Sequence, residues 1–447
     1  MRNFRLSLVL LATTTASFLT PFTTSSITLA FPKISAEFNV SLADVNWVSN
    51  IFLIALASSV LILGLLSDSI GRNRIFISGI VLFIITSLAL YNTYTFREML
   101  IYRSIQGIAS AMISATAVAI LSEYFPREIR GLAIGINTAS VYLGLSLAPL
   151  LGGYIVERYG WRALFLFKIS IALIACLSAF VSVRSGYRSK EIKIDLPRAL
   201  LIISATIAMT YGTSVLNTLA GSICFPLGLI AFITIFILET RKPALLNPSL
   251  LRRRLIFANL AALLNYSATY AITIALSDYL QSIRGFKPGE TGLILSAQPI
   301  VQVIISPVTG LLSDRYDPSV IASIGMFIIA LGISPLLLLT YNTSIYYLLI
   351  VLVVLGLGFA LFASPNTTAI MNMSPREAYA SATSLLATMR FLGQAISTSI
   401  ITLSMQSQEN LLEAIKISFI IYVMLSFIGA FLSLLARIEE RLLPTYS

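Results

Sequence analysis

The fold is decided by a short basic stretch between two long apolar runs, Gly64-Leu65-Leu66-Ser67-Asp68-Ser69-Ile70-Gly71-Arg72-Asn73-Arg74. Either run could cross a bilayer, so we expect the stretch to lie at a membrane surface. Gly64 and Gly71 permit tight turning and close approach of backbones. Asp68 and Arg72 are four residues apart and could pair with each other, or each could reach a neighbouring helix. Alone, the stretch is compatible with a positively charged anchor between two membrane helices.

The composition indicates an integral membrane protein. Hydrophobic residues make up 57% of the 447 residues and charged residues 11%, whereas a soluble domain carries about 25% charged residues. The net charge is +11, but the basic residues lie in short loops between apolar runs, which favours membrane orientation over nucleic-acid binding. Histidine is absent, and the two cysteines, Cys176 and Cys224, lie inside apolar runs as packing residues do. We therefore expect no metal, no cofactor and no nucleic-acid partner.

The apolar runs predict fourteen transmembrane helices, with no room between them for a soluble domain. The first run is longer than the apolar core of a signal peptide, and we interpret it as a retained helix. An alternative with twelve helices, in which 196–239 does not cross, stays open. The expected spans are residues 4–31, 44–66, 74–91, 97–124, 130–155, 161–183, 196–216, 222–239, 255–282, 290–313, 319–340, 344–372, 378–404 and 412–436.

The distribution of Lys and Arg predicts the orientation. With the N-terminus in the cytoplasm, twenty of the 30 Lys and Arg residues fall on the cytoplasmic side, six fall outside and four lie within spans. This asymmetry is the one that the positive-inside rule expects. We therefore expect a multi-pass protein of the cell membrane with both termini in the cytoplasm.

An internal repeat is visible in the sequence G-L-L-S-D, which ends in Asp68 after the second span and in Asp314 after the tenth. Its position in each set of six helices suggests a duplication, although chance similarity between two apolar-to-polar boundaries is the alternative. We expect a six-helix half at 1–183, two linking helices with basic cytoplasmic loops at 184–254, and a second six-helix half at 255–447. Repeated halves around a site at the bilayer midplane are a transporter design.

Four stretches resemble the major facilitator superfamily, in particular its fourteen-helix drug:proton antiporter family. They are the stretch 64–74, the pattern R-x-x-Q-G at 103–107, the small residues and proline of the fifth span, and Y-G-W-R at 159–162. The chain departs from the family pattern at Ser69, Asn73 and Ala148, the last of which replaces a glycine before proline. The resemblance implies an all-α integral membrane fold, two six-helix repeats plus two linking helices, that exports its substrate by alternating access.

The fifth span combines small residues with one proline. Small side chains let a neighbouring helix pack closely, and proline removes a backbone hydrogen bond and bends the helix. Ordinary membrane-helix packing would also explain this pattern, but the resemblance favours a bend and a tight seam that opens and closes during transport. The positions are Gly135, Gly144, Pro149, Gly152 and Gly153.

Cationic residues lie inside predicted spans, where charged side chains usually face the bundle interior. Arg103 in the fourth span shares a helical face with Gln106, and the resemblance implies that Arg103 takes part in proton or substrate coupling. Arg390 lies midway along the thirteenth span, with Gln394 on its face. Arg103 could instead snorkel to the outer surface, and Arg390 could be structural. Lys168, near the outer end of the sixth span, is a weaker candidate.

Polar residues of other spans predict the lining of a cavity. Aromatic rings with scattered hydroxyls and amides suit a moderately apolar, loosely specified substrate. Each residue taken singly could instead form a hydrogen bond between helices. The positions are Thr24, Tyr266, Tyr270, Gln298 and Gln302.

The deep interior lacks an obvious carboxylate. The family often has an aspartate nine residues before the proline that ends the first span, and here Thr23 occupies that position before Pro32. Asp278, near the outer end of the ninth span, is the best remaining carboxylate for proton coupling. With Arg103 and Arg390 inside the spans, neutral or anionic substrates become as plausible as cations.

These observations predict a secondary active exporter of small amphipathic or hydrophobic, drug-like compounds, coupled to protons and working as a monomer in the bilayer. The chain has no G-x-x-x-x-G-K-[ST] phosphate loop, so ATP is not its direct energy source. No catalytic triad is apparent, which argues against an enzyme. An uncoupled facilitator or solute-specific importer is the alternative.

The stretch 64–74 then becomes a gate on the cytoplasmic side. We expect Asp68 to pair with Arg72 or Arg130 when that side is closed. Gly64, Gly71, Arg72, Arg74 and Asp314 are expected to belong to the same gate.

Overall fold

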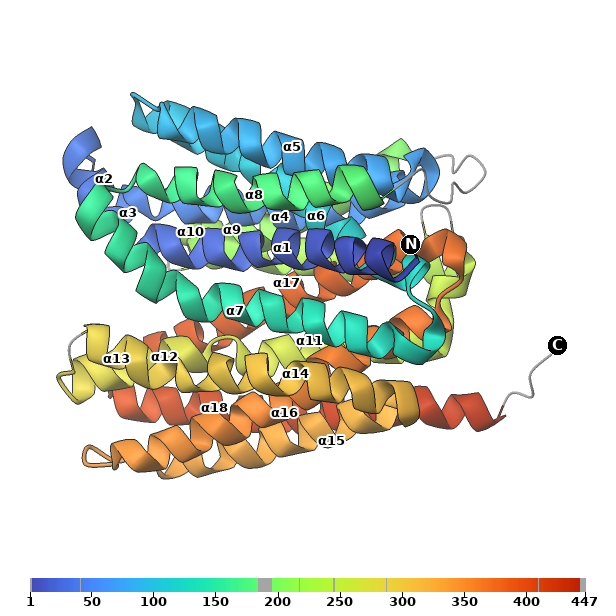
Figure 1. The fold of residues 1–447 in the computed structure, drawn as a ribbon. Coiled ribbons are helices and arrows are strands. Elements are labelled where there is room, and N and C mark those ends of the chain that lie inside the picture. The colour runs from blue at the N-terminus through green and yellow to red at the C-terminus, as the bar shows by residue number, and fades with distance from the viewer. Residues whose placement is uncertain are drawn as a thin grey trace.

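The computed structural model describes residues 2–40, 42–183, 195–216, 218–243, 246–286, 288–408 and 410–442. These residues form helices joined by short turns and no strand. Figure 1 shows that the long helices run side by side along one axis, and that α1 begins and α18 ends on the same side of the bundle. We call that side the terminal end and the other side the opposite end.

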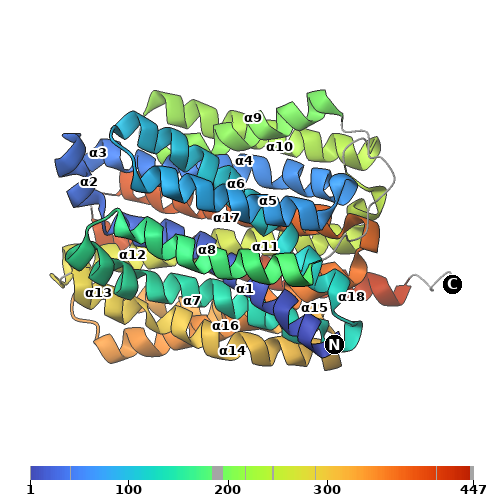
Figure 2. The same ribbon diagram turned by 45° about the horizontal axis from the view of Figure 1, so that its top comes forward.

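The N-terminal half consists of six long helices, with two short helices between the first and the second. Its elements are α1 (Arg2–Thr28), α2 (Phe31–Phe38), α3 (Leu42–Val45), α4 (Trp47–Ile70), α5 (Arg72–Tyr91), α6 (Phe96–Tyr124), α7 (Arg127–Tyr159) and α8 (Ala163–Ser182). Two linking helices follow, α9 (Leu196–Ser214) and α10 (Leu219–Arg241), and then the short turn η1 (Pro248–Leu251). Figure 2 shows α9 and α10 side by side at the edge of the bundle.

The C-terminal half repeats this plan with more interruptions. Its elements are α11 (Arg253–Thr269), α12 (Ile272–Asp278), η2 (Tyr279–Ile283), α13 (Pro288–Leu295), α14 (Ala297–Arg315), α15 (Pro318–Ile333), η3 (Ser334–Leu338), α16 (Ile345–Met373), η4 (Arg376–Ala378), α17 (Tyr379–Ser407) and α18 (Leu411–Leu442).

The helices pair in the same way in both halves. In the N-terminal half α1 packs on α7 and α8, α4 packs on α6, and α5 packs on α6 and α8. In the C-terminal half α11 packs on α17 and α18, α14 packs on α16, and α15 packs on α16 and α18. The two halves meet mainly where α7 runs along α14 and where α4 runs along α17. This symmetric packing is what a duplicated six-helix unit produces.

Twelve described helical segments are long and apolar enough to cross a membrane, so this criterion does not support the expected count of fourteen. The two expected spans that fall short correspond to α9, which has 19 residues, and α17, which is rich in Ser and Thr. The alternative in which all of 196–239 stays out of the membrane differs from this result too, because α10 is among the twelve. Most of the first basic linking loop, 184–194, lies outside the described residues.

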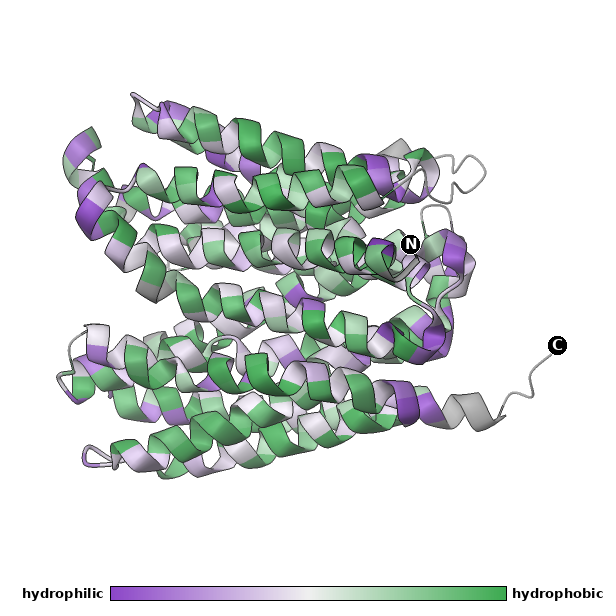
Figure 3. Ribbon diagram, in the orientation of Figure 1, coloured by the Kyte–Doolittle hydropathy of each residue, from purple (hydrophilic) through white to green (hydrophobic). Residues whose placement is uncertain are grey.

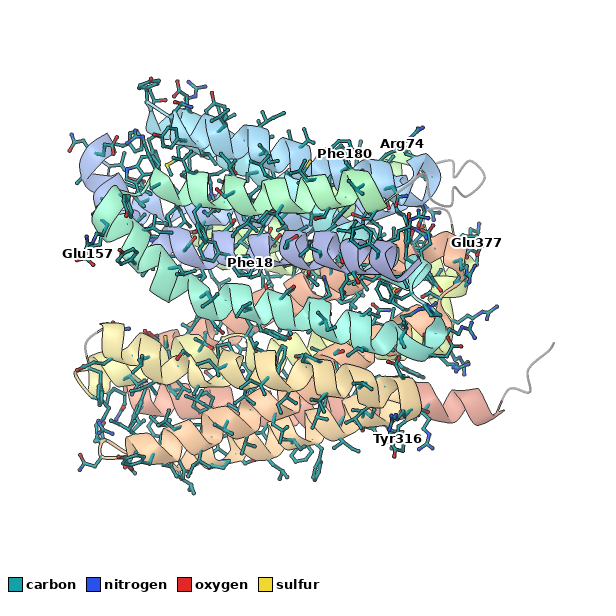
Figure 4. The ribbon with its side chains drawn as sticks, in the orientation of Figure 1. Phe18, Arg74, Glu157, Phe180, Tyr316 and Glu377 are labelled. Carbon is teal, nitrogen blue, oxygen red and sulfur yellow. The ribbon has the colours of Figure 1, made fainter. Side chains whose placement is uncertain are left out.

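The surface of the bundle is apolar, as a bilayer requires. Leu177, Phe180 and Ile350 are each more than 60% exposed on the sides of long helices. Figure 3 shows hydrophobic residues along the helix flanks and hydrophilic residues gathered mainly at the two ends. In Figure 4 the side chain of Phe180 points outward from the flank, whereas Arg74 and Glu377 lie at the terminal end. The chain is therefore a multi-pass membrane protein.

The stretch 64–74 joins two of these helices at the terminal end. Gly71 caps α4 with φ 115° and ψ 121°, a conformation that favours glycine, and its N–H donates to the Ser67 carbonyl at 2.9 Å. Because the turn needs only this one residue, α5 begins directly at Arg72. The charges on either side of Gly71 are thereby fixed beside the interface between the halves.

Candidate functional site

A cavity of about 630 Å³ lies between the two halves and is lined by both. The N-terminal half contributes residues of α1, α4, α6 and α7, and the C-terminal half contributes residues of α11 to α14, α16 and α17. The polar and aromatic residues of the lining include Ser17, Thr20, Thr24, Ser114, Asn137, Tyr142, Ser146, Tyr266, Tyr270, Gln298, Gln302, Phe359, Thr367, Arg390, Phe391 and Gln394.

Seven residues expected from the sequence lie together in this lining. They are Thr24, Tyr266, Tyr270, Gln298, Gln302, Arg390 and Gln394. Three other expected residues, Arg103, Gln106 and Asp278, do not line it. Asp278 is partly buried at the end of α12, and Lys168 is fully buried within α8, also outside the lining.

Aromatic side chains form a group on one wall of the cavity. The rings of Tyr142 and Tyr266 both meet Phe359 edge-on, with centroid distances of 5.8 and 5.4 Å. This geometry is favourable for aromatic pairs and leaves ring surface available to an apolar ligand. Tyr142 and Phe359 were not predicted from the sequence, because an aromatic residue inside an apolar run carries no signal of the cavity that it faces.

Arg390 places a positive charge at the cavity wall. Its Nη2 donates a hydrogen bond to the Thr367 hydroxyl at 2.9 Å, and its guanidinium lies 5.6 Å from the centroid of the Tyr266 ring. Its Nε is buried and has no hydrogen-bond partner among the described residues. No acidic residue occurs in the described lining, so the field in the cavity is positive.

Arg103 and Gln106 instead connect helices inside the N-terminal half. The Arg103 side chain is fully buried, so it does not snorkel to the surface. Its Nε donates to the Val48 carbonyl at 2.9 Å and its Nη1 donates to the Gln106 amide oxygen at 2.7 Å. The Gln106 amide nitrogen donates in turn to the Ser87 hydroxyl at 2.8 Å. These bonds link α4, α6 and α5.

Asp68, at the end of α4, holds the start of α17 in the other half. Its Oδ1 accepts the Ala380 N–H at 3.2 Å, and its Oδ2 accepts the Ser381 N–H at 2.8 Å and the Ser381 hydroxyl at 2.5 Å. N–H groups in the first turn of a helix have no partner within the helix. The negative charge of Asp68 also faces the positive end of the helix dipole, so both effects stabilise the contact.

Arg72 completes this contact from the start of α5. It is fully buried, its Nε donates to Asp68 Oδ1 at 2.9 Å, and its Nη1 donates to Glu123 Oε2 at 2.9 Å. Its Nη2 donates to the carbonyl oxygen of Arg376, which lies in η4 just before α17. The expected pair of Asp68 with Arg72 is thus present, and it bridges the two halves.

Asp314 makes the equivalent contact at the end of α14. Its Oδ1 accepts the Gly131 N–H at 2.6 Å and its Oδ2 accepts the Leu132 N–H at 2.9 Å, both near the start of α7. Arg130 does not pair with the aspartate of α4, because its Nη1 donates to the Asn372 amide oxygen at 3.1 Å. The two copies of G-L-L-S-D therefore join the halves at two points of the terminal end. We call these two contacts the gate, after the role that we propose for them below.

Glycines bring the paired helices close enough for the gate contacts. A Cβ added at Gly310 would lie 2.3 Å from the Gly131 carbonyl oxygen, and one added at Gly64 would lie 1.8 Å from the Ser384 hydroxyl oxygen. Both distances are far below van der Waals contact. The first residue of each G-L-L-S-D copy is therefore a packing requirement of the interface.

A second repeat, which was not predicted, marks the helix starts that the two aspartates hold. Pro-Arg-Glu occurs at 126–128, where α7 begins, and again at 375–377, just before α17. Both copies stand at the same place in their half. Comparing the two halves residue by residue beyond G-L-L-S-D would have found it.

The glycines expected to act together in the fifth span serve two different interfaces. Gly135 packs against α14 of the other half, because an added Cβ would lie 2.6 Å from the Ser306 carbonyl oxygen. Gly144 and Gly152 pack against α1 within the N-terminal half, whereas Gly153 has only loose contact. The side chain of Pro149 lies outside the described residues. Figure 1 shows that α7 changes direction before it reaches the opposite end.

Comparison with known proteins agrees with this architecture. The family description Major Facilitator Superfamily matches residues 13–250 and 258–445. The riboflavin transporter RibZ of Clostridioides difficile (strain 630) is 27% identical over 380 residues, which cover 84% of this chain and 82% of RibZ. The multidrug resistance protein Stp of Mycobacterium tuberculosis (strain CDC 1551 / Oshkosh) is 27% identical over 408 residues, which cover 88% of this chain and 75% of Stp.

The fold also matches solved structures. The proton:xylose symporter XylE, bound to 6-bromo-6-deoxy-D-glucose, superposes with a TM-score of 0.70 at 15% identity, covering 96% of this chain and 95% of XylE. The expected family subtype with fourteen helices is not established by these matches. The family and these relatives are transporters, so the protein is a membrane transporter of small molecules and not an enzyme. With almost the whole sequence matched and the fold shared, the chain belongs to the major facilitator superfamily.

Proposed function

We propose that the protein exports small amphipathic or hydrophobic compounds across the cell membrane by alternating access, in exchange for protons. The observation that carries this proposal is the cavity between the halves, which combines aromatic and apolar walls with scattered amides and hydroxyls. Sites of this composition suit moderately apolar, loosely specified ligands. The similarity to the multidrug resistance protein Stp supports the same substrate class.

The gate supports alternating access. The two aspartate contacts hold the halves together at the terminal end. With both termini in the cytoplasm, this conformation is closed on the cytoplasmic side and can release substrate on the other side. The transition to the inside-facing conformation requires both contacts to break.

We also infer that α9 and α17 cross the membrane, which gives fourteen spans. α17 packs against α4, α6, α11 and α18, so its polar residues face protein rather than lipid. The mean hydropathy of α17 therefore underestimates its ability to cross the membrane. α9 has 19 residues, about 28 Å of helix, and packs along α10 and α4. An even number of spans keeps both termini on the cytoplasmic side.

Transport in everted membrane vesicles tests the proposal. An acidic lumen should drive accumulation of amphipathic fluorescent compounds, and a protonophore should abolish it. Transport that ignores both the pH gradient and the membrane potential would refute proton coupling. Arg103→Ala and Asp278→Asn should each impair the gradient-driven step, and normal transport in both variants would remove these residues from the coupling mechanism.

An uncoupled facilitator or solute-specific importer is the second candidate. Arg390 and the amides of Gln298, Gln302 and Gln394 offer several directional hydrogen bonds, which suit one polar solute. The similarity to a riboflavin transporter points the same way. Counterflow of a single defined solute, unaffected by any gradient, would favour this candidate over export.

A further inference from the structure

Lys168 is a buried cation that the gate and the cavity do not use. It lies in α8, its side chain is fully buried, and its Nζ has no hydrogen-bond partner among the described residues. The nearest aromatic ring, that of Phe165, lies with its centroid 4.8 Å from Nζ. An ammonium group without water or a partner is very costly in such surroundings. A charged Lys168 without a partner is therefore not a stable arrangement.

A second buried cation lies in the same half of the protein. Arg103 of α6 is also fully buried. Its guanidinium is held by the bonds to Val48 and Gln106 and lies 4.4 Å from the centroid of the Phe52 ring. Like charges repel each other more strongly in the interior than in water. Of the two groups, an arginine keeps its proton, so the lysine is the one that can give its proton up.

The charged groups of the other helices packed on α8 lie elsewhere. Arg5 of α1 donates to the Ser182 carbonyl, at the far end of α8. Arg72 and Arg74 of α5 lie at the terminal end, the former held in the gate. Glu157 and Arg158 of α7 are exposed at the opposite end. No carboxylate of these helices neutralises Lys168 in the part of the chain that the structure describes.

The equivalent lysine of the other half is partly exposed and paired with an acidic residue. The sequence Lys-Ile-Ser occurs at 168–170 in α8 and at 416–418 in α18, the equivalent helix of the second half. Lys416 is partly exposed, and its Nζ donates to Glu413 Oε1 at 3.0 Å. One member of the pair is thus partly exposed and paired with an acid, whereas the other is buried without a hydrogen-bond partner among the described residues. The difference makes Lys416 a matched control for Lys168.

We propose that Lys168 takes up and releases a transported proton. This inference rests on the proposed proton-coupled function. In the proposed cycle, Lys168 is neutral while α8 is packed as described here. When transport moves α1, which lies between the cavity and α8, water reaches Nζ and a proton from water binds its lone pair. Renewed packing returns that proton to water on the other side, so the step needs no further reactant.

Two variants and two readouts test the role of Lys168. Lys168→Met should lose accumulation driven by a pH gradient, and it should lose proton release on substrate binding in weakly buffered detergent solution. It should retain counterflow without a gradient, because the cavity and the gate are unchanged. Lys168→Arg should also lose proton release, since arginine stays charged. Lys416→Met should behave like the wild type in every assay.

The outcomes separate the inference from the proposed function. Gradient-driven accumulation by Lys168→Met at the wild-type rate would overturn the role of Lys168. A wild-type protein without any gradient response would refute proton-coupled export itself. In that case the pH dependence of the counterflow rate still tests whether Lys168 titrates. The same pH midpoint in the wild type and in Lys168→Met would exclude Lys168 as the titrating group. Size-exclusion profiles show whether Lys168→Met is folded, and Lys168→Gln replaces it if it is not.

Discussion

Asp68 and Asp314 occupy equivalent positions in the two halves, and each accepts the backbone N–H groups at the start of a helix in the other half. Asp68 holds α17 through Ala380 and Ser381, and Asp314 holds α7 through Gly131 and Leu132. The contact is reciprocal, so each half both supplies an aspartate and offers a helix start. Loss of either carboxylate should weaken the closed terminal end without disturbing the core of its own half.

Asp68→Asn should leave the protein folded but slow its transport. Asparagine keeps one acceptor but loses the charge that faces the helix start and Arg72. Hydrogen bonds to a charged group contribute about 1.5–3 kcal/mol each, so the closed conformation should lose roughly tenfold or more in population. Spin labels at Arg74→Cys and Tyr316→Cys, exposed at the terminal end in different halves, would report longer distances.

The control for this substitution is Glu413→Gln, which removes a carboxylate from an exposed pair at the surface. Such pairs contribute about 0–1 kcal/mol. If Asp68→Asn transports at the wild-type rate, the stretch 64–74 is an anchor and not a gate.

Asp314→Asn should also slow transport and lengthen the label distances, but by less than Asp68→Asn. Asp314 accepts two backbone N–H groups, whereas Asp68 also receives the buried guanidinium of Arg72 and the Ser381 hydroxyl. Transport rates and label distances for Asp68→Asn, Asp314→Asn and the double variant measure this difference. A larger effect of Asp314→Asn than of Asp68→Asn would contradict the role assigned to Arg72.

Gly310→Ala should separate α14 from α7 at the gate. The added methyl group would lie 2.3 Å from the Gly131 carbonyl oxygen and 3.0 Å from the Gly135 Cα. Overpacking of this kind costs about 1–3 kcal/mol, which would be avoided in the conformation where the two helices are apart. We expect slower transport and longer label distances at the terminal end. Gly289→Ala is the matched control, because an added Cβ there meets nothing within 4 Å.

The pairing of Asp68 with Arg72 could be predicted from sequence because charged and small residues stand out beside an apolar run. Few structural roles explain a carboxylate, two arginines and glycines next to an apolar run. The second copy at 310–314 reduced the number of such roles further. The helix starts that receive Asp68 and Asp314 carried a usable signal too, the repeated Pro-Arg-Glu, which was overlooked. The partners across the interface could not be read from either copy alone.

For the cavity and the interior cations, sequence patterns do not predict which residues a side chain contacts. Tyr142 and Phe359 look like any aromatic residues of an apolar helix, and only packing places them beside Tyr266. Arg103 was correctly expected in the interior, but its helical face does not tell whether it points to the cavity or to α4 and α5. The hydropathy criterion leaves out α17, although the sequence predicted a span at 378–404. α17 packs against several other helices, so it can carry polar residues that hydropathy counts against a membrane span.

Arg390→Met should change which compounds are transported. Arg390 is the charged side chain among the described residues that line the cavity. Its Nε has no hydrogen-bond partner among the described residues, so it can bind an anionic or electron-rich group of the substrate. Losing this interaction should weaken transport of anionic amphipathic compounds by roughly tenfold, with little loss for neutral ones and a gain for cationic ones. Competition of dyes of each charge against one neutral fluorescent substrate measures the preference. Arg437→Met, which removes a cation paired with Asp317 at the surface, should leave the preference unchanged. An equal loss for all three charge classes in Arg390→Met would mean that Arg390 supports the cavity wall and does not select the substrate.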